Sequence, residues 1–339
     1  MTERRALITG AGGEMGSLLV PELRKRGVTV AALDLVEPPA VLREQCVETR
    51  VTSVLDTTAL EEMFRRHGFT EVYHLAAVLS SKAERDPDLA HRVNVVGTYG
   101  LLRLCQQVPA HPVRFLFPSS IAVYGLPDGE TKRSAGCIRA DEWTTPSGMY
   151  GCNKLYCEML GSYLTRRAPL DGEQALDFRS IRFPGLVSAD TLPSGGTTDY
   201  APEMIHAAAR GERYSCFVAE GTRLPFMTMP DAVEALITLA AAAPERLSTR
   251  VYNIRGFSVS AGEIAEEVWH HFPDADIRFA PVASRQAIVD TWPEDVDDSP
   301  ARRDWGLAPR HGFHAAIADY LVPALRRRSS PAAEGSGGS

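Results

Sequence analysis

The amino-terminal stretch constrains the fold more than any other part of the sequence. It begins with a short apolar segment, Arg5–Thr9, which predicts a strand, and continues with a turn containing Gly10, Gly13 and Gly16. Apolar residues at helical spacing then run as far as Gly27. A strand, a glycine turn and a helix in this order are typical of a dinucleotide-binding turn, because the glycines let backbone amides approach a pyrophosphate. A turn with a purely structural role is the alternative.

A second apolar strand is predicted at 28–33 and ends at Asp34. This position, about 20 residues past the glycines, is where a carboxylate accepts hydrogen bonds from an adenosine ribose. A carboxylate there would repel the 2′-phosphate of NADP, and no arginine follows at once to hold such a phosphate. The sequence therefore predicts NAD as the cofactor, with a solvated strand-end aspartate as the alternative.

Predicted strands and helices alternate over the rest of the first half. The predicted segments are a strand at 46–51, a helix at 58–67, a strand at 71–77, a helix at 89–108 and a strand at 113–117. Alternation of this kind implies a parallel sheet with helices on both faces and ligands at the carboxyl ends of the strands. The expected fold class is α/β, a Rossmann-type doubly wound parallel sheet with a smaller carboxyl-terminal α/β lobe.

Tyr150 and Lys154 lie four residues apart on a predicted helix and therefore share one face. A phenol has a pKa near ~10, and a cation beside it favours the phenolate, which makes the tyrosine usable as a general acid or base. Ser120 follows the strand that precedes this helix, where its hydroxyl can hold a reacting oxygen. The alternative for the Tyr-Lys pair alone is an exposed helix face with a half-buried tyrosine.

In this order the motifs resemble the short-chain dehydrogenase/reductase superfamily, in its extended, epimerase-like branch. The matching pieces are Thr9-Gly-x-x-Gly-x-x-Gly16, Asp34, His74-Leu-Ala-Ala77, Asn94, Ser120, Tyr150, Lys154 and Arg182-Phe-Pro-Gly185. The resemblance implies that Tyr150 is the acid/base, that Lys154 lowers its pKa and holds the nicotinamide ribose, and that Ser120 positions the substrate oxygen. The cofactor contacts that it implies are Gly10, Gly13, Glu14, Met15, Gly16, Asp34, Asp56, Leu75, Ala76, Ala77, Asn94, Tyr150, Lys154 and Pro184.

The remaining third is similar to the short-chain type of L-threonine 3-dehydrogenase. The similarity rests on 194–200, 224–231, Arg285-Gln286, 290–293 and 297–305. It implies oxidation of the β-hydroxyl of L-threonine, or of a related 3-hydroxy amino acid, to 2-amino-3-oxobutanoate. The substrate contacts that it implies are Ser80, Ser120, Tyr150, Thr197, Thr198 and Asp199. The alternatives are a nucleotide-sugar 4-epimerase or dehydratase with tightly bound NAD, and a catalytically silent NAD-sensing protein.

Two segments, 126–139 and 166–177, look longer than their counterparts in that family, and Ser120 stands where the family often has threonine. The first segment is expected beside the mouth of the active site, where it would reshape the substrate pocket. The predicted organisation is an NAD-binding domain at 1–185, a mainly substrate-binding lobe at 186–325 that is interleaved with it, and a disordered tail or linker at 329–339.

Composition sets the remaining expectations. The net charge of −7 argues against a nucleic-acid partner. The six cysteines form no Cys-x-x-Cys pair and no metal spacing with histidine, so we expect reduced thiols and no metal. The absence of a signal peptide and of an apolar run of about 18 residues predicts a cytoplasmic protein without a membrane partner. The resemblance also implies a homodimer that acts on a small molecule.

Overall fold

A parallel sheet of seven strands forms the centre of the protein, in the order β11-β7-β5-β4-β1-β2-β3. The computed structural model describes residues 3–108, 111–167, 175–190 and 196–329. The sheet strands are β1 (Arg5–Thr9), β2 (Thr29–Asp34), β3 (Glu48–Val51), β4 (Glu71–His74), β5 (Val113–Ser120), β7 (Leu176–Phe183) and β11 (Val251–Asn253). The strand order reverses between β1 and β4, which is the point where such sheets bind ligands. The predicted fold class is confirmed.

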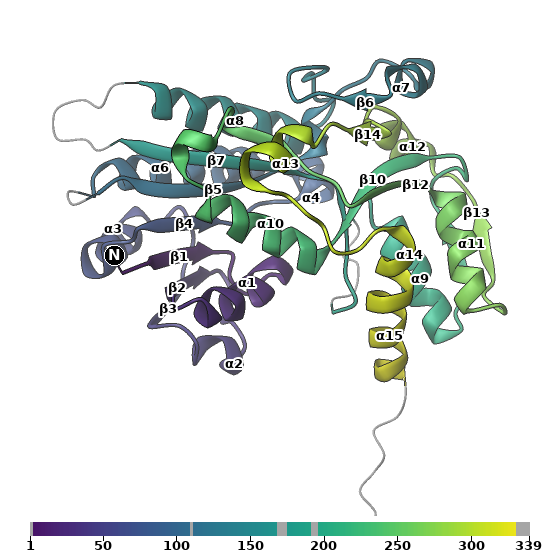
Figure 1. The fold of residues 1–339 in the computed structure, drawn as a ribbon, viewed down its shortest axis with the longest axis horizontal. Helices are drawn as coiled ribbons and strands as arrows, with labels where there is room; N and C mark the ends of the chain where they lie inside the picture. The colour runs from purple at the N-terminus through teal and green to yellow at the C-terminus, as the bar shows by residue number, and fades with distance from the viewer. Residues whose placement is uncertain (1–2, 109–110, 168–174, 191–195, 330–339) are drawn as a thin grey trace, which may run out of the picture.

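Helices cover both faces of this sheet (Figure 1). On one face, α1 (Glu14–Lys25) and α10 (Met229–Ala241) share one apolar core with the strands. On the other face, a second core joins α3 (Thr57–His67), α6 (Thr98–Gln106) and α8 (Met149–Arg166). The small helix α2 (Ala40–Arg43) lies beside α1. Burial on both faces explains why the central strands are continuous apolar runs rather than alternating ones.

The smaller lobe has its own core around a sheet in the order β12-β10-β8. Its strands are β8 (Gly185–Val187), β10 (Arg223–Thr228) and β12 (Phe257–Ser260), with the pairs β9 (Tyr214–Cys216)–β13 (Ile277–Phe279) and β6 (Cys137–Ile138)–β14 (Asp295–Val296). Its helices include α9 (Tyr200–Arg210), α11 (Ala261–His271), α12 (Ala283–Asp290), α14 (Phe313–Ala315) and α15 (Val322–Ser329), whereas α13 (Ser299–Trp305) packs on β11 of the larger sheet. A capping box formed by Ser260 and Glu263 opens α11.

Some predicted boundaries were wrong. The strand predicted at 71–77 ends at His74. The helix predicted at 89–108 consists of α5 (Pro87–Ala90), a π-helical stretch η1 (His91–Gly97) and α6. Part of the segment 166–177, as well as the predicted tail from 330 onwards, lies outside the described residues. The division of the chain at residue 185 stays a prediction, although α10 and β11 both pack on the first sheet.

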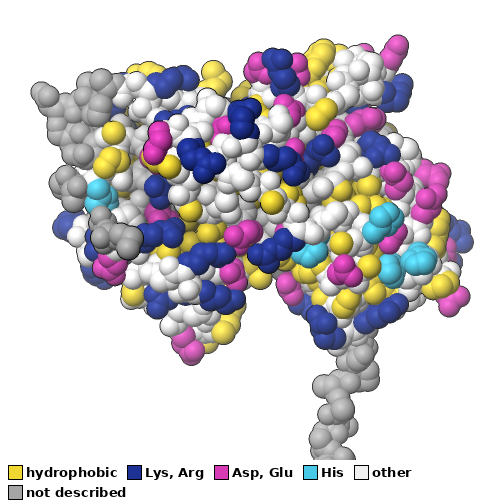
Figure 2. All heavy atoms as spheres, in the orientation of Figure 1, with side chains coloured by type: hydrophobic (Ala, Val, Ile, Leu, Met, Phe, Trp, Pro, Cys, Tyr) yellow, Lys and Arg dark blue, Asp and Glu magenta, His cyan; other side chains and the backbone are white. Residues whose placement is uncertain are grey.

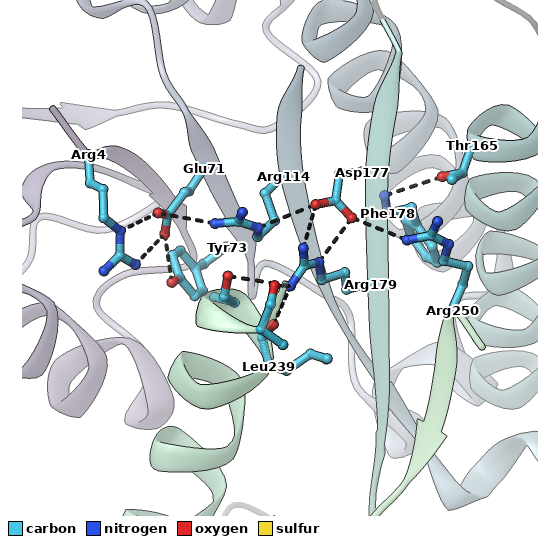
Figure 3. A network of polar contacts seen from close by, with 12 residues as sticks. Arg4, Glu71, Tyr73, Arg114, Thr165, Asp177, Phe178, Arg179, Leu239 and Arg250 are labelled. Atoms are coloured by element: carbon cyan, nitrogen blue, oxygen red, sulfur yellow. Dashed lines mark hydrogen bonds and ion pairs between the residues drawn. The ribbon is translucent and has the colours of Figure 1, made fainter. Parts of the chain in front are cut away.

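A network of ionic contacts crosses the amino-terminal ends of the sheet strands (Figure 3). Glu71 is 2.6 Å from Arg4 and 3.6 Å from Arg114, and Asp177 is 3.4 Å from Arg114 and 2.6 Å from the fully buried Arg179. Arg179 also donates to the backbone carbonyls of α10 and the residue after it. These groups stabilise the end of the sheet that lies opposite the carboxyl-terminal ends of the strands.

The surface carries charges of both signs. Figure 2 shows basic and acidic side chains interspersed over the face drawn there, rather than separated by sign. Among the residues that the structure describes, no helix combines the length and the apolar character that crossing a bilayer requires. The six cysteines are all free thiols.

Candidate active site

A cavity of about 980 Å³ runs along the carboxyl ends of β1, β2, β4, β5 and β7. It therefore lies at the edge of the sheet that the strand pattern predicted. The predicted site residues that line it are Gly10, Gly13, Glu14, Met15, Gly16, Asp34, Leu75, Ala76, Ala77, Ser80, Ser120, Tyr150, Lys154, Pro184, Thr197, Thr198 and Asp199. Segments from both lobes meet around one space.

The glycine turn between β1 and α1 has no room for side chains at two positions. Gly10 has a φ of +71°, and a Cβ there would lie 2.7 Å from the amide nitrogen of Ala76. A Cβ on Gly16 would lie 2.4 Å from the carbonyl oxygen of Ala11. The first residue of α1 follows Gly13, whose missing side chain leaves the amides of the first helical turn without a side-chain cap. Such uncapped amides are the usual partners of a phosphate group.

Asp34 ends β2 beside this turn. Its carboxylate accepts hydrogen bonds from the backbone N–H groups of Gly12 at 2.9 Å and of Val36 at 3.2 Å. These two bonds hold the carboxylate at the rim of the cavity, while its remaining lone pairs can accept from a ribose hydroxyl.

Two predicted cofactor residues, Asp56 and Asn94, do not line the cavity. Asp56 is the N-cap of α3, where it accepts from the backbone N–H of Ala59 at 3.0 Å. The buried Asn94 accepts from the backbone N–H of Val78 at 2.7 Å and donates to the carbonyl of the same residue. It also donates to Asn153 on α8 at 3.3 Å. Asn94 therefore fixes the chain after β4 to the helix that carries Tyr150.

The structure brings Ser120, Tyr150 and Lys154 together in the cavity wall. Lys154 is buried, and its Nζ donates to the carbonyl of Pro118 at 2.6 Å. The same Nζ lies 5.5 Å from the centroid of the Tyr150 ring. Helix α8 packs closely against the segment that follows Ser120. A Cβ on Gly151 would lie 2.0 Å from the carbonyl oxygen of Ala122, which shows how close the two backbones are.

Burial shifts the pKa values of both members of the pair. Burial raises the pKa of Tyr150 above its ordinary value, and the lowering of this pKa by Lys154 stays a prediction. Desolvation disfavours the charged phenolate, and the ammonium group of Lys154 donates to the carbonyl of Pro118. Burial also lowers the pKa of Lys154 to about 8, partly offset by Cys157 and Glu158.

The low pKa of Lys154 predicts a pH-dependent stability. Because the folded pKa of about 8 is below the ordinary value of 10.5, the unfolded chain binds more protons between these two pH values. The free energy of unfolding should therefore rise across this window by about 3 kcal/mol relative to Lys154→Met, which lacks the titrating group. Urea denaturation of both proteins at pH 7.5, 9 and 10.5 measures this difference. A difference that does not change with pH would contradict the lowered pKa.

A chain of buried polar groups beneath the cavity was not foreseen from the sequence. Thr9 lies 2.7 Å from Nδ1 of His74, whose Nε2 lies 2.9 Å from the hydroxyl of Thr98. Thr98 donates to the carbonyl of Asn94, so His74 must donate from Nε2 and accept at Nδ1. Burial, reinforced by the charge of Lys154, lowers the pKa of His74 to about 3, which keeps the ring neutral. This series of hydrogen bonds connects β1 and β4 to Asn94 on η1, which in turn donates to α8.

On the substrate side, Ser80 and Thr197 approach one another from the two lobes, with their hydroxyl oxygens 3.4 Å apart. Asp199 accepts from the backbone N–H of Gly196 at 2.6 Å, and Arg285 donates to the carbonyl of Gly196 at 2.7 Å. The first residues of the predicted loop, up to 195, lie outside the described residues. Cavity-lining residues that we did not predict include Lys82, Arg85, Phe183, Met229 and Trp292.

The described residues contain no group of three His, Cys, Asp or Glu side chains placed to hold a metal ion. Two polar atoms of the cavity wall are buried and have no hydrogen-bond partner in the described part of the protein, Ser119 Oγ and Glu14 Oε1. A buried hydroxyl without a partner is unfavourable by about 1–3 kcal/mol, so Ser119 indicates a polar ligand in this space. The uncapped turn, the Asp34 carboxylate and Ser119 together fit a dinucleotide.

Comparisons with known proteins agree with this geometry. Residues 6–254 match the model of the NAD dependent epimerase/dehydratase family. The chain is 35% identical to the mitochondrial L-threonine 3-dehydrogenase of Bos taurus over 92% of its own length and 79% of the relative. Among solved structures, a monomeric L-threonine 3-dehydrogenase from a metagenome is 33% identical, with a TM-score of 0.85 over 96% of this chain and all of that one, 100%.

A more distant solved structure is the Thermus thermophilus UDP-glucose 4-epimerase in complex with NAD. It is 25% identical, with a TM-score of 0.75, and the match covers 95% of this chain and 99% of that one. These similarities extend over both lobes and confirm the resemblance seen in the motifs. The chain therefore belongs to the NAD dependent epimerase/dehydratase family, with NAD as its cofactor.

Proposed function

We propose that this protein oxidises the β-hydroxyl of L-threonine, or of a closely related 3-hydroxy amino acid, to 2-amino-3-oxobutanoate or its analogue. One observation carries the proposal: Ser120, Tyr150 and Lys154 share a cavity with the Ser80–Thr197 pair. The first set can handle a hydroxyl proton, and the second set supplies donors for an amino acid carboxylate. The identity to L-threonine 3-dehydrogenases over most of the chain supports the same substrate.

The roles within the reaction follow from the positions of the side chains. The Ser120 hydroxyl holds the substrate oxygen, and Tyr150 Oη receives its proton as the carbon–oxygen double bond forms. Lys154 provides the nearest positive charge for the phenolate, as long as the pH stays below its pKa of about 8. When bound, NAD supplies the hydride acceptor. The same phenol, protonated, returns the proton in the reverse direction.

The cofactor residues are assigned by their place in the cavity. Amides of the glycine turn bind the pyrophosphate, Asp34 accepts from the adenosine ribose, and Lys154 donates to the nicotinamide ribose. The further predicted contacts are Leu75, Ala76, Ala77 and Pro184. Asp56 and Asn94 act indirectly, through the helix cap and the backbone of Val78.

The α-carboxylate and the α-ammonium group of the substrate are assigned to residues that offer each of them a hydrogen-bond partner. Ser80, Thr197 and Thr198 donate to the α-carboxylate, and Asp199 provides the acceptor for the α-ammonium group. Because Asp199 already accepts from the backbone N–H of Gly196, only its second oxygen and free lone pairs serve the substrate.

The test is formation of NADH from NAD, followed by its absorbance, with L-threonine, L-serine and larger 3-hydroxy amino acids as substrates. We expect turnover that is fastest with L-threonine, and identification of 2-amino-3-oxobutanoate as the product. Failure to form NADH with any of these compounds would exclude the proposed substrate class.

A second candidate activity is that of a nucleotide-sugar 4-epimerase or dehydratase, which the likeness to the UDP-glucose 4-epimerase supports. Such an enzyme would retain NAD through purification and convert a UDP- or dTDP-sugar without net NADH. A catalytically silent NAD-sensing protein would turn over neither class of substrate. The same assay, run with nucleotide sugars beside the amino acids, separates the three.

We also infer a homodimer in the cytoplasm. Five large apolar side chains are exposed on α8 and on the adjacent η1–α6 helix, namely Val96, Tyr99, Tyr156, Met159 and Tyr163. A second copy of the chain is the occupant that the resemblance implies for this face. The free thiols suit a reducing compartment, and fractionation of cells would test the location.

Met159 is exposed at 65% of its surface on this face, so Met159→Glu should produce a monomer if the face is a dimer contact. Sedimentation velocity of the two proteins measures the change. Val282→Glu, on the smaller lobe, is the matched control because that side chain is exposed at 46% but lies away from α8. A monomeric parent protein would contradict the inference.

A further inference from the structure

The segment 126–139 is packed against the stretch 289–297, which carries Trp292. Figure 1 shows α7 (Gly129–Ala135), β6, β14 and α12 gathered at one end of the molecule. Strand β6 pairs in parallel with β14, so that Ile138 lies opposite Val296. The backbone N–H of Asp297 also donates to the carbonyl of Ile138 at 2.8 Å. The segment 126–139 is therefore not a free surface loop.

Lys132 anchors the middle of the segment. This lysine on α7 is only 4% exposed, and its Nζ donates to the carbonyl of Val289 at 2.8 Å, in the last turn of α12. Burial lowers the pKa of Lys132 to about 8, and the carboxylates of Asp290 and Glu294 partly offset this effect. A buried lysine is unfavourable unless it is paired, so the hydrogen bond to Val289 fixes the position of the ammonium group.

Two further hydrogen bonds reach the residue that precedes Trp292. The backbone N–H of Leu126 donates to the carbonyl of Thr291 at 2.8 Å. The hydroxyl oxygens of Ser147 and Thr291 lie 3.0 Å apart. Lys132, β6 and these two bonds thus hold the chain on both sides of Trp292.

Trp292 forms part of the cavity wall that also contains Tyr150 and Thr197. The indole is only 6% exposed and belongs to the same apolar core as Leu126, Ile138 and Val289, against which Tyr150 also packs. A shift of the 289–297 stretch would therefore move one wall of the space in which the substrate reacts.

We propose that the segment 126–139 is a specificity element. Docked through Lys132, it fixes Trp292 at the distance that admits the β-methyl group of a small 3-hydroxy amino acid and excludes larger β-substituents. Lys132 is a positioning residue that acts through Trp292 and does not touch the substrate. The inference rests on the proposed function for the substrate class, whereas the docking itself does not depend on it.

The first test compares Lys132→Met with Arg133→Met. The methionine keeps the apolar stem of Lys132 and removes the donor, whereas Arg133 is an exposed neighbour on the same helix. We expect Lys132→Met to raise KM for L-threonine about tenfold. The ratio of kcat/KM for L-threonine to kcat/KM for 3-hydroxynorvaline should fall by a similar factor. The kcat and the KM for NAD should stay near their parent values. Arg133→Met should change none of these constants.

The second test needs no substrate. Amide hydrogen exchange of residues 289–297 should be faster in Lys132→Met than in the parent protein and unchanged in Arg133→Met. If Lys132→Met does not fold, Ser147→Ala should show the same change at smaller amplitude, because it removes one bond to Thr291 and no buried charge.

The outcomes separate the two proposals. An unchanged exchange rate at 289–297 would overturn the docking role, whatever the substrate. Faster exchange with an unaltered preference between L-threonine and 3-hydroxynorvaline would overturn the specificity role. A parent protein that is inactive with every 3-hydroxy amino acid would overturn the proposed function, and hydrogen exchange alone would then decide whether Lys132 fixes the stretch around Trp292.

Discussion

Tyr150→Phe should reduce kcat by about 100- to 10,000-fold, the range that a positioned general acid or base contributes. The substitution removes only the hydroxyl that exchanges a proton with the substrate and leaves the ring that packs beside Lys154. Because the ring contributes the apolar contacts, we expect little change in the free energy of unfolding or in the affinity for NAD. Steady-state rates of NADH formation, together with fluorescence titration of NADH binding, measure the two effects.

Tyr156→Phe is the matched control for this variant. Tyr156 lies on the same helix but on the exposed face proposed for dimer contact, outside the cavity wall, with 53% of its area exposed. Its loss of a hydroxyl should leave kcat unchanged. If Tyr150→Phe retained full activity, the proton would have to be transferred by another group, and the assignment of the acid/base would fall.

Glu158→Ala should have the largest effect on stability, lowering the free energy of unfolding by about 3–5 kcal/mol. Glu158 lies one turn after Lys154 on α8 and forms two hydrogen bonds, 2.9 and 2.6 Å long, with Arg182 on β7. Both side chains are almost fully buried. Removal of the carboxylate would leave the guanidinium of Arg182, among the residues that the structure describes, with only Tyr124 and the carbonyl of Ala140 as partners.

Urea denaturation measures this change, and Asp141→Asn provides the control. Asp141 forms a two-bond pair with Arg139 that resembles the buried pair in geometry but is exposed to water. Screening and hydration make such a surface pair nearly neutral for stability, so we expect no measurable change there. Equal effects of the two variants would show that burial does not determine the strength of the Glu158–Arg182 pair.

The parts of the fold that the sequence predicts are those set by local patterns. Strands β1, β2 and β5 are short apolar runs bounded by turn residues, and Asp34 and Ser120 end two of them. The edge of the sheet where the cavity lies then follows from the parallel order of the strands. Tyr150 and Lys154 share a helix face for the same local reason.

The parts that escaped prediction depend on contacts between distant segments. Nothing in the local pattern distinguishes the buried Lys132 from an exposed lysine, because its burial results from α12 packing on α7. Trp292 enters the cavity through the same packing. The spacing of apolar residues at the 3.6-residue period does not distinguish the π-helical stretch η1 from an α-helix. Asp56 carries a carboxylate of the kind that binds a cofactor, but in the structure this carboxylate caps the amino terminus of α3.

The position of β11 in the sheet has a consequence for any attempt to divide the protein. This strand comes from the second half of the chain, yet it pairs with β7 of the first half and covers that edge. A fragment ending at residue 185 would also lack α10, whose apolar side packs on the sheet. Such a fragment would expose an unpaired strand edge and is expected to aggregate. The two halves should instead regain activity only when they are produced together, as a complementing split enzyme.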